Sequence, residues 1–388
     1  MNFDKKLQKE LDARKAKHLY RSRKILQSPQ SIEPVIDGKK VLSFCSNDYL
    51  GLANHPDVIK VFKRAADEYG VGSGSAHLVS GHSTEHHALE EELAAFTGYP
   101  RALLFSTGYM ANLGVISALC DRHSEIYEDK LNHASLLDAA QLSRAKRLRY
   151  PHNDMQNLQQ RLSQSTAETR LVVSDGVFSM DGDFAPLDSM AELCEKNNAI
   201  LMIDDAHGLG VVGEKGKGIK EHFKLTAAQL PVLVGTLGKA LGTAGAFVAG
   251  SEALIETLIQ KSRSYIFTTA MPAAIAAATR KSLELAEKEN WRREKLQQLI
   301  SRFRTGAKEL GLQLMDSSTA IQPVIIGPSE KTVEISEQLL RKNILISAIR
   351  PPTVPDGTSR LRITFSATHS EEHVVKLLDA LAVLLKTS

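Results

Sequence analysis

The sequence predicts an α/β protein: a mostly parallel, seven-stranded sheet covered by helices, with a smaller α+β C-terminal domain and an N-terminal helical arm. Between residues 72 and 250, seven apolar runs alternate with helical patterns, which is typical of a parallel sheet with helices on both faces. After residue 272, two long helical patterns precede a mixed set of runs and helices. The expected boundaries are 1–50 for the N-terminal helix and hairpin arm, 51–285 for the large domain and 286–388 for the C-terminal domain.

The N-terminal elements are predicted from local patterns. Apolar residues fall among charged ones between residues 3 and 27, which predicts an amphipathic helix that lies on another surface. Two extended runs, 35–36 and 41–44, flank Asp37 and Gly38, a two-residue turn signal that predicts a β-hairpin. A helix is expected from residue 56 to 69.

The seven apolar runs are the expected strands of the sheet: residues 102–105, 126–127, 147–150, 171–174, 200–203, 232–234 and 246–248. Helices are expected between them at 110–119, 155–162 and 189–196. The C-terminal part predicts helices at 273–288, 291–310, 333–340 and 371–385, with strands at 321–326, 344–349 and 361–365. Because ligands of such sheets bind beyond the carboxyl ends of the strands, residues that follow a strand are the first candidates for a site.

Composition and charge exclude several classes of protein. The 388 residues are 43% hydrophobic and 24% charged, and 48 basic residues nearly balance 45 acidic ones, so neither nucleic acid nor a membrane surface is expected as a partner. Cys45, Cys120 and Cys194 lack a C-x-x-C spacing, which favours a reducing cytoplasm. No apolar run reaches the roughly 18 residues of a membrane span, and the first residues resemble neither a signal peptide nor a transit peptide.

One lysine stands among glycines where a strand is expected to end. The stretch 234–242 reads VGTLGKALG, with Lys239 inside it. Glycine lets the backbone approach a ligand closely, and an amine held in a tight, partly desolvated turn becomes a better nucleophile. Lys239 is therefore a candidate for forming a Schiff base, although this stretch alone also fits an exposed loop lysine. A nucleoside-triphosphate loop is disfavoured because Ala240 stands where Ser or Thr is required.

An acidic residue and a histidine follow another expected strand. Asp204 comes directly after the apolar run 199–203, and His207 lies three positions further on. The carboxylate suits pairing with a cationic ring nitrogen, and the imidazole suits a hydrogen bond to a phenolic oxygen. Metal binding by Asp204, Asp205 and His207 and a structural Asx turn are the alternatives.

Three further histidines lie close together earlier in the chain. His82 and His86 are four positions apart, beside His87, a spacing that also occurs in metal sites. Because glutamates surround them, a solvated helix start is the expected structure, and no metal site is predicted.

A turn suited to an anion completes the set. Residues 105–112, FSTGYMAN, predict a strand end followed by a helix start, where the backbone N–H groups of Gly108 and Tyr109 can bind a phosphate; a plain strand-to-helix turn is the alternative. Pyridoxal 5'-phosphate (PLP) needs three groups from a protein: a reactive amine, a carboxylate for its ring nitrogen and a binding site for its phosphate. PLP is therefore the predicted cofactor.

Four motifs resemble those of the α-oxoamine synthases: 77–81 (HLVSG), 176–183 (GVFSMDGD), 204–208 (DDAHG) and 235–239 (GTLGK). The resemblance runs from about residue 21 to near the C-terminus. It implies a PLP enzyme of fold type I that joins an amino acid to an acyl-CoA with loss of CO2. Within the family, residues 20–23 (YRSR) and 349–355 (IRPPTVP) favour L-alanine and a pimeloyl thioester, carried by CoA or acyl carrier protein, as substrates in biotin biosynthesis.

The resemblance also implies roles for single residues. Lys239 would bind the cofactor aldehyde and move protons at the substrate Cα. Asp204 would pair with the ring nitrogen, His207 would contact the ring oxygen, and His133 would stack on the ring. The other cofactor contacts would be Gly108, Tyr109, Ser179 and Thr236, and the substrate contacts would be Arg21, Asn47, His133, Thr353 and Arg362.

The family also implies a homodimer with the active site at the interface. In such a dimer, Thr268 or Thr269 would reach the cofactor phosphate of the second subunit. The sequence departs from the family at Asp175, where related synthases often carry Glu. This difference puts one supporting contact in doubt but no catalytic role.

Three other functions stay open. Another α-oxoamine synthase, such as a glycine C-acetyltransferase, shares the lysine motif but usually differs around residues 351–355. An aminotransferase of the same fold type would form a keto acid without consuming a thioester. A non-catalytic partner subunit is the alternative from another class, and such subunits typically lack the lysine that is present at 239.

Overall fold

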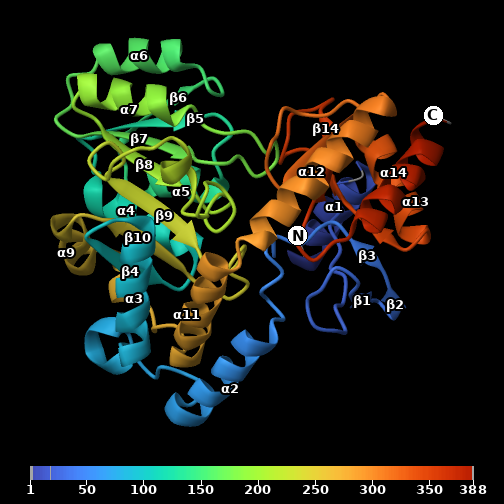
Figure 1. Ribbon diagram of the computed structural model, residues 1–388. Helices are drawn as coiled ribbons and strands as arrows, with labels where there is room; N and C mark the ends of the chain where they lie inside the picture. Colours follow the sequence, from blue (N-terminus) through green and yellow to red (C-terminus); the bar gives the residue numbers. More distant parts are fainter. Residues whose placement is uncertain (1–2, 18, 387–388) are drawn as a thin grey trace. The chain divides into compact units, whose positions relative to one another are not determined.

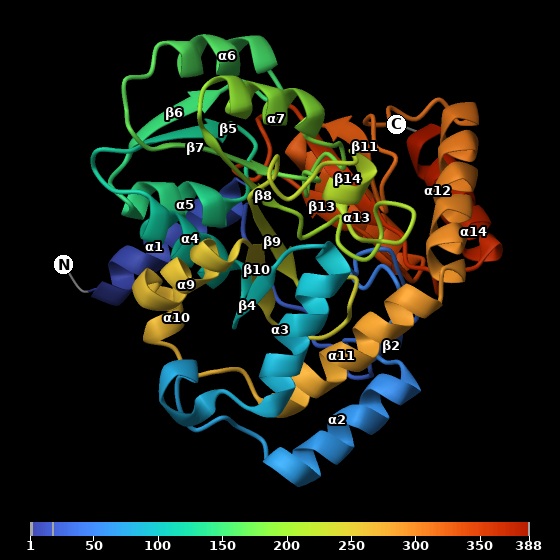
Figure 2. The same ribbon diagram turned by 60° about the vertical axis from the view of Figure 1, so that its left-hand side comes forward.

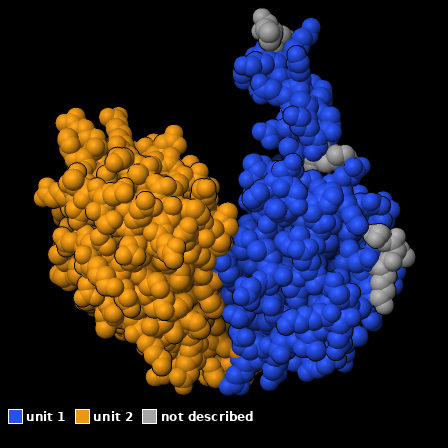
Figure 3. All heavy atoms as spheres, turned by 90° about the horizontal axis from the view of Figure 1, so that it is seen from above, with its two compact units in different colours: residues 1–49, 180–183, 294–388 blue, residues 50–179, 184–293 orange. Residues whose placement is uncertain are grey.

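The structure is a computed structural model that describes residues 3–17 and 19–386 (Figure 1). The chain forms two compact units, shown in separate colours in Figure 3. Unit 1 contains residues 1–49, 180–183 and 294–388, and unit 2 contains residues 50–179 and 184–293. The division into three domains that the sequence suggests stays a prediction.

Unit 2 is built on a seven-stranded sheet in the order β4-β10-β9-β8-β7-β5-β6. Its strands are β4 (Arg101–Phe105), β5 (Glu125–Asp129), β6 (Lys146–Tyr150), β7 (Arg170–Asp175), β8 (Ile200–Asp204), β9 (Val232–Thr236) and β10 (Ala246–Gly250). Only β10 is antiparallel to its neighbours, so the other six strands share one direction. The predicted mostly parallel sheet is confirmed, and each of the seven predicted runs lies within one of its strands.

Helices cover both faces of this sheet. Alternate strand residues such as Leu103, Val173 and Val234 form one buried cluster with α4 (Gly108–Leu119), α5 (Ala134–Leu142) and α9 (Glu252–Lys261). The residues between them face the other way because side chains alternate along a strand. That second face is contacted by α3 (Thr84–Thr97), α6 (Met155–Ser163) and α7 (Leu187–Lys196) (Figures 1 and 2).

The remaining helices of unit 2 extend from this core. They are α2 (Pro56–Tyr69), the π-helix η1 (His77–Gly81), α8 (Ile219–His222), α10 (Arg263–Ile266) and α11 (Ala273–Lys288), while α12 (Trp291–Glu309) begins in unit 2 and continues in unit 1. Helix α11 packs on both α2 and α3.

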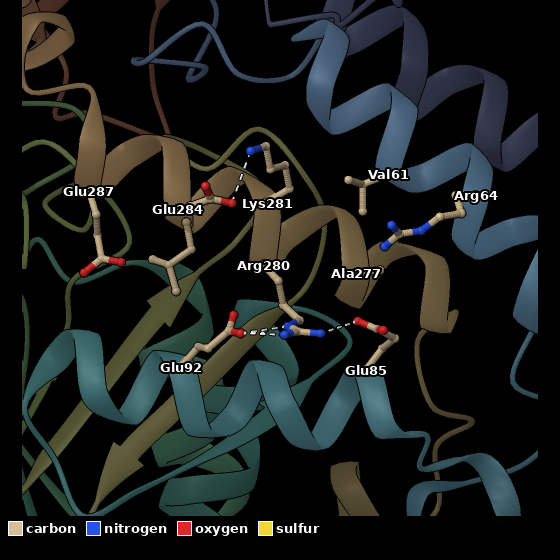
Figure 4. Close-up of a pocket in the computed structure, with 10 residues that line it drawn as sticks. Val61, Arg64, Glu85, Glu92, Ala277, Arg280, Lys281, Glu284 and Glu287 are labelled. Atoms are coloured by element: carbon tan, nitrogen blue, oxygen red, sulfur yellow. Dashed lines mark hydrogen bonds and ion pairs between the residues drawn. The ribbon is translucent and has the colours of Figure 1, made fainter.

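A pocket of about 370 Å³ lies between α2, α3 and α11, and Figure 4 shows its charged lining. Arg280 of α11 forms ion pairs across it with Glu85 and Glu92 of α3. None of the residues that line this pocket is a predicted site residue.

Unit 1 contains a three-stranded sheet in the order β11-β14-β13 and a separate parallel pair of β12 with β3. The strands are β3 (Leu42–Ser43), β11 (Ile321–Gly327), β12 (Ile344–Leu345), β13 (Ser347–Ile349) and β14 (Ser359–Thr364). Its helices are α1 (Phe3–Ala16), α13 (Ser329–Arg341), α14 (Glu371–Lys386) and most of α12. The predicted run 344–349 is divided between β12 and β13, because the chain changes partner strand at Ile346.

Two N-terminal predictions are corrected. Helix α1 ends at Ala16 rather than near residue 27. None of its residues is buried, so tertiary packing does not extend it. The hairpin is present, but its second strand is β2 (Lys39–Lys40), which pairs with β1 (Val35–Ile36). Asp37 and Gly38 both have positive φ, as a tight two-residue hairpin turn requires, so pairing starts directly after the turn.

In the described parts of the chain, no helix is long and apolar enough to cross a membrane.

Candidate active site

Five of the parallel strands end at the same edge of the sheet, and most of the predicted cofactor residues follow them. Gly108 comes after β4, His133 after β5, Ser179 after β7, Asp204 ends β8, and Lys239 comes after β9. Parallel strands bring their carboxyl ends together, so the topology collects residues from distant parts of the sequence at one edge.

Lys239 lies in a tight turn between β9 and β10. Its carbonyl oxygen accepts a hydrogen bond from Gly242 N–H at 2.9 Å, and Gly242 has a φ of +65°. A Cβ at Gly242 would lie 2.3 Å from the backbone nitrogen of Ala53, so only glycine allows this approach. The turn leaves the Lys239 side chain half-buried, with Nζ 2.9 Å from Nε2 of His207. The structure therefore brings the predicted lysine and histidine together.

The Asp204 carboxylate is buried and hydrogen-bonded. Its Oδ2 accepts from Nδ2 of Asn112 at 2.7 Å, and its Oδ1 accepts from the N–H of Ala206 at 3.0 Å. Asn112 Nδ2 also donates to Ser135 Oγ at 2.8 Å, which links the first turns of α4 and α5 to the end of β8. These two bonds fix the position and orientation of the carboxylate.

His133 precedes α5 and is held on two sides. Its backbone N–H donates to Oδ2 of Asp175 at 2.6 Å. Its Nδ1 accepts from the N–H of Ser135 at 3.3 Å and lies 2.8 Å from Ser135 Oγ. With Nδ1 as the acceptor, the proton of a neutral ring is on Nε2, which leaves an N–H donor on the far side of the imidazole.

The charges of Lys239 and Asp204 both act on His133. Burial lowers the pKa of His133, with Lys239 lowering it further and Asp204 raising it. Burial raises the pKa of Asp175 well above its usual range, and the neighbouring Asp204 carboxylate raises it further. The lysine amine and the Asp204 carboxylate therefore belong to one electrostatic site. Asp175 contributes one contact, the hydrogen bond that it accepts from the His133 backbone.

The alternative metal site at Asp204, Asp205 and His207 is not supported. Oδ2 of Asp205 accepts from the N–H of Ile219 at 2.7 Å, and His207 faces Lys239. Burial raises the pKa of the Asp205 carboxyl to about 8. Among the described residues, the groups with metal-ligand spacing do not include these three side chains.

The other predicted cofactor residues lie at or near the same edge of unit 2. Gly108 is the first residue of α4, and a Cβ built on it would meet nothing within 4 Å, so the space beside this helix start is open. Tyr109 is exposed, and its hydroxyl donates to Asp138 of α5. Thr236 Oγ1 donates to the carbonyl of Gly245 at 3.1 Å, and Ser179 is half-buried.

The predicted substrate residues other than His133 belong to unit 1. Arg362 of β14 is buried, and its two terminal nitrogens donate to Oδ1 of Asn47 at 3.4 and 3.3 Å. Tyr49 donates to the same oxygen at 3.2 Å. Arg21 and Thr353 are exposed. Burial lowers the pKa of Arg350, and the nearby charge of Arg21 lowers it further.

The donor set of unit 2 fits PLP. The half-buried amine suits the aldehyde of the cofactor, and the buried, hydrogen-bonded carboxylate suits its ring nitrogen. The histidine beside the amine suits the ring oxygen, and the open helix start suits the phosphate. This chemistry defines a PLP-type site on an α/β sheet.

Comparison with known proteins agrees with this class. A family model described as aminotransferase class I and II matches residues 39–381. The chain therefore belongs to the class I and II aminotransferase family.

Individual relatives show which members of this family the chain is similar to. The 8-amino-7-oxononanoate synthase of Cellvibrio japonicus is 60% identical over 387 residues, which are 100% of this chain and 97% of the relative. That of Nitrosococcus oceani is 59% identical over 376 residues, which are 97% of this chain and 100% of the relative. The expected likeness to this member of the α-oxoamine synthases is confirmed.

Solved structures show the same fold. Serine palmitoyltransferase from S. paucimobilis, with PLP and myriocin bound, matches with a TM-score of 0.93 at 30% identity, covering 98% of this chain and 97% of that one. The 8-amino-7-oxononanoate synthase from Francisella tularensis matches with a TM-score of 0.79 at 31% identity, covering 89% and 98%. The predicted fold type I architecture is confirmed.

The residues that hold the predicted ones in place were not predicted. Asn112 lies within the stretch 105–112, but nothing in the sequence indicates that its amide joins Asp204 to Ser135. The prediction for His86 was half wrong: it lies at a helix start, but it is fully buried rather than solvated. Its ring points into unit 2 and forms a hydrogen bond with the carbonyl of Met271 at 2.7 Å. This contact buries His86 although its neighbours in the sequence are charged.

Proposed function

We propose that the protein catalyses the PLP-dependent condensation of L-alanine with a pimeloyl thioester, which releases CO2 and the thiol carrier and yields 8-amino-7-oxononanoate for biotin biosynthesis. The observation that carries the proposal is the identity of about 60% over the full chain to synthases of that name, together with the intact Lys239, His207 and Asp204 set. A non-catalytic role is disfavoured because the lysine is present and positioned.

Residues of unit 2 would hold the cofactor. Lys239 Nζ would attach it through the aldehyde, Asp204 would pair with the ring nitrogen, and His207 would contact the ring oxygen. The start of α4 at Gly108 and Tyr109, with Ser179 and Thr236, would bind the phosphate, because unsatisfied N–H groups at a helix start attract anions. When bound, PLP supplies an electron sink that stabilises negative charge at the substrate Cα.

Lys239 would be the proton carrier of the reaction. Its amine is half-buried and lies 2.9 Å from a histidine, so it can take the proton from Cα of alanine and return one after CO2 is lost. The glycine-bounded turn fixes its backbone, which limits the positions that the amine can reach.

His133 would donate a hydrogen bond to the reacting substrate. Because Nδ1 accepts from Ser135, the Nε2–H is the free donor, suited to the carboxylate before CO2 is lost or to the new keto oxygen. Asp175 would keep the ring in position by accepting from the His133 backbone.

Arg362 would bind the carboxylate of the amino acid, with Asn47 orienting the guanidinium. Arg21 and Thr353 would contact the acyl substrate. These roles rest on the family resemblance and on the buried position of Arg362.

The test is product analysis with two substrate pairs. Purified protein with L-alanine and pimeloyl-CoA should release CO2 and form 8-amino-7-oxononanoate, measured by mass spectrometry, and pimeloyl acyl carrier protein serves as the second acyl donor. Glycine with acetyl-CoA should react far more slowly. Preferred turnover of glycine with acetyl-CoA, or keto acid formation without thioester consumption, would contradict the proposal.

A homodimer in the cytoplasm is part of the proposal. Val71, Val79 and Phe267 expose 90%, 78% and 69% of their surface, and exposed apolar residues that lie together mark interaction surfaces. A β-bridge between Ala76 and Thr269 brings their segments side by side within unit 2. Light scattering should give twice the mass of one chain, and a monomer at assay concentration would contradict this part of the proposal.

A further inference from the structure

Five titratable side chains cluster around the first turns of α3, apart from the residues assigned to PLP. They are His77, His82, His86, His87 and Glu90. Two subsets bring three potential ligand atoms within 4.8 Å of one another: His77 with His82 and His86, and His82 with His87 and Glu90. Imidazole nitrogens and carboxylate oxygens are ligands of Zn²⁺, so both subsets are candidate cation sites.

Hydrogen bonds occupy both ring nitrogens of His86 and exclude it as a metal ligand. Its Nδ1 accepts from the backbone N–H of Ser83 at 3.0 Å, as part of the cap of α3. The proton of the neutral ring is therefore on Nε2, which donates to the carbonyl oxygen of Met271 at 2.7 Å. Both ring nitrogens are in use, so the first subset has at most two ligands.

The second subset keeps its ligand atoms available. His82 Nδ1 lies 2.9 Å from His77 Nδ1, so one of the two nitrogens carries a proton. When His82 donates this proton, the lone pair of its Nε2 is free, and that atom lies 3.9 Å from Oε2 of Glu90. A ligating histidine usually donates its other N–H to a neighbouring acceptor, and His77 is that acceptor.

Glu90 is a fixed ligand rather than a loose surface carboxylate. Its side chain is 12% exposed, and its Oε1 accepts from the backbone N–H of Leu104 in β4 at 2.9 Å. This bond orients the carboxyl group and leaves Oε2 toward His82. His87 is 68% exposed, and its Nε2 lies 3.6 Å from Oε1 of Glu91, a weak contact that a cation can replace.

We propose that His82, His87 and Glu90 bind a divalent transition cation of the Zn²⁺ class, with water completing the coordination. Tetrahedral bonds of about 2.0–2.1 Å separate two ligand atoms by about 3.4 Å, so the pair at 3.9 Å has to close by only about 0.5 Å. Two imidazoles and one carboxylate favour Zn²⁺ and its neighbours over Mg²⁺ or Ca²⁺, which prefer oxygen ligands.

A bound cation would connect the start of α3 to β4 through Glu90. Strand β4 leads directly to Gly108, so the site braces the strand that carries the proposed phosphate turn. Since the unfolded chain lacks this arrangement of ligands, the cation should also stabilise the folded state.

The test is titration of the holoenzyme with Zn²⁺ by isothermal calorimetry. We expect one equivalent per chain and a higher Tm with Zn²⁺ than with Mg²⁺. His87→Ala removes an exposed ligand without disturbing the core and should weaken binding at least tenfold, and Glu90→Gln should do the same while keeping the side-chain shape. The matched control, His123→Ala, removes an exposed histidine elsewhere on unit 2 and should leave the affinity unchanged.

Two results would overturn the proposal: no saturable binding of Zn²⁺, or binding that is as tight in His87→Ala as in the unaltered protein. If Glu90→Gln fails to fold, His87→Ala still decides. Anomalous scattering at the zinc edge should place the ion beside His82. None of these measurements depends on catalytic turnover, so the cation site and the proposed reaction can fail independently.

Discussion

Asn112 links Asp204 to the rest of the site, and its replacement by alanine tests whether that link matters. The side chain is fully buried and donates to Asp204 at 2.7 Å and to Ser135 at 2.8 Å, while its Oδ1 has no hydrogen-bond partner among the described residues. A bond to a charged group contributes about 1.5–3 kcal/mol and a neutral one about 0.5–1.5 kcal/mol. Asn112→Ala should therefore lower the free energy of unfolding by about 2–4 kcal/mol.

This loss translates into a measurable shift in Tm. An unfolding entropy of about 2.1 cal/mol/K per residue gives roughly 0.8 kcal/mol/K for the whole chain, so Tm should fall by about 3–5 °C. Calorimetry or circular dichroism measures it. Ser117→Ala on the same helix removes only a local bond to Gly114 and should change stability by no more than about 0.5 kcal/mol.

Activity separates a positioning role from a structural one. With Asp204 no longer fixed by the amide, kcat should fall at least tenfold, with a smaller change in KM for alanine. A lower Tm with unchanged kcat would mean that Asn112 only packs and that the reasoning about Asp204 is wrong.

Three further predictions concern Asp204, the arginines of β14 and His369. Asp204→Asn keeps the shape of the side chain but removes its charge, so turnover should fall by more than about a hundredfold while the protein stays folded, as judged by circular dichroism. Arg362→Leu should raise KM for alanine by about ten- to a hundredfold. Arg360→Leu removes the ion-pair partner of the buried Asp181 carboxylate, 2.7 Å away, and should lower the free energy of unfolding by about 3–5 kcal/mol. Burial lowers the pKa of His369 to about 4 from its ordinary 6.5, so the unfolded chain binds the proton more readily and stability should fall by up to about 3 kcal/mol as the pH drops through this window.

Each of these has a result that would refute it. Near-normal turnover of Asp204→Asn would remove the carboxylate from the proposed chemistry. Equal changes in KM for the two arginine variants would mean that Arg362 has no special role. If His369→Gln shows the same loss of stability between pH 6.5 and 4 as the unaltered protein, His369 is not the group responsible.

The fold was predictable because its signals are local and repeated. Buried parallel strands favour apolar runs, and helical patterns separate several of the runs of unit 2. The run 147–150 (RLRY) is the least apolar of them, and it forms the edge strand β6. The small β-structure of unit 1 was less predictable, because Leu42–Ser43 pairs with Ile344–Leu345, far away in the sequence. No local pattern specifies such a partner.

The candidate site divides in the same way. Lys239 and Asp204 were found because cofactor chemistry restricts the residue types that can follow those strands. The supporting contacts of Asn112 and Asp175 were not found, because amides and carboxylates are common in loops and only the folded sheet edge brings them together. His86 shows the opposite case, in which a histidine among charged residues turns inward to bond a distant carbonyl.

The covalent role of Lys239 is tested most directly by reducing the holoenzyme with borohydride and mapping the modified peptide by mass spectrometry. We predict a single pyridoxyl group, on Lys239, and its complete loss in Lys239→Ala. A label on another lysine, or none on a catalytically active preparation, would contradict the proposed chemistry.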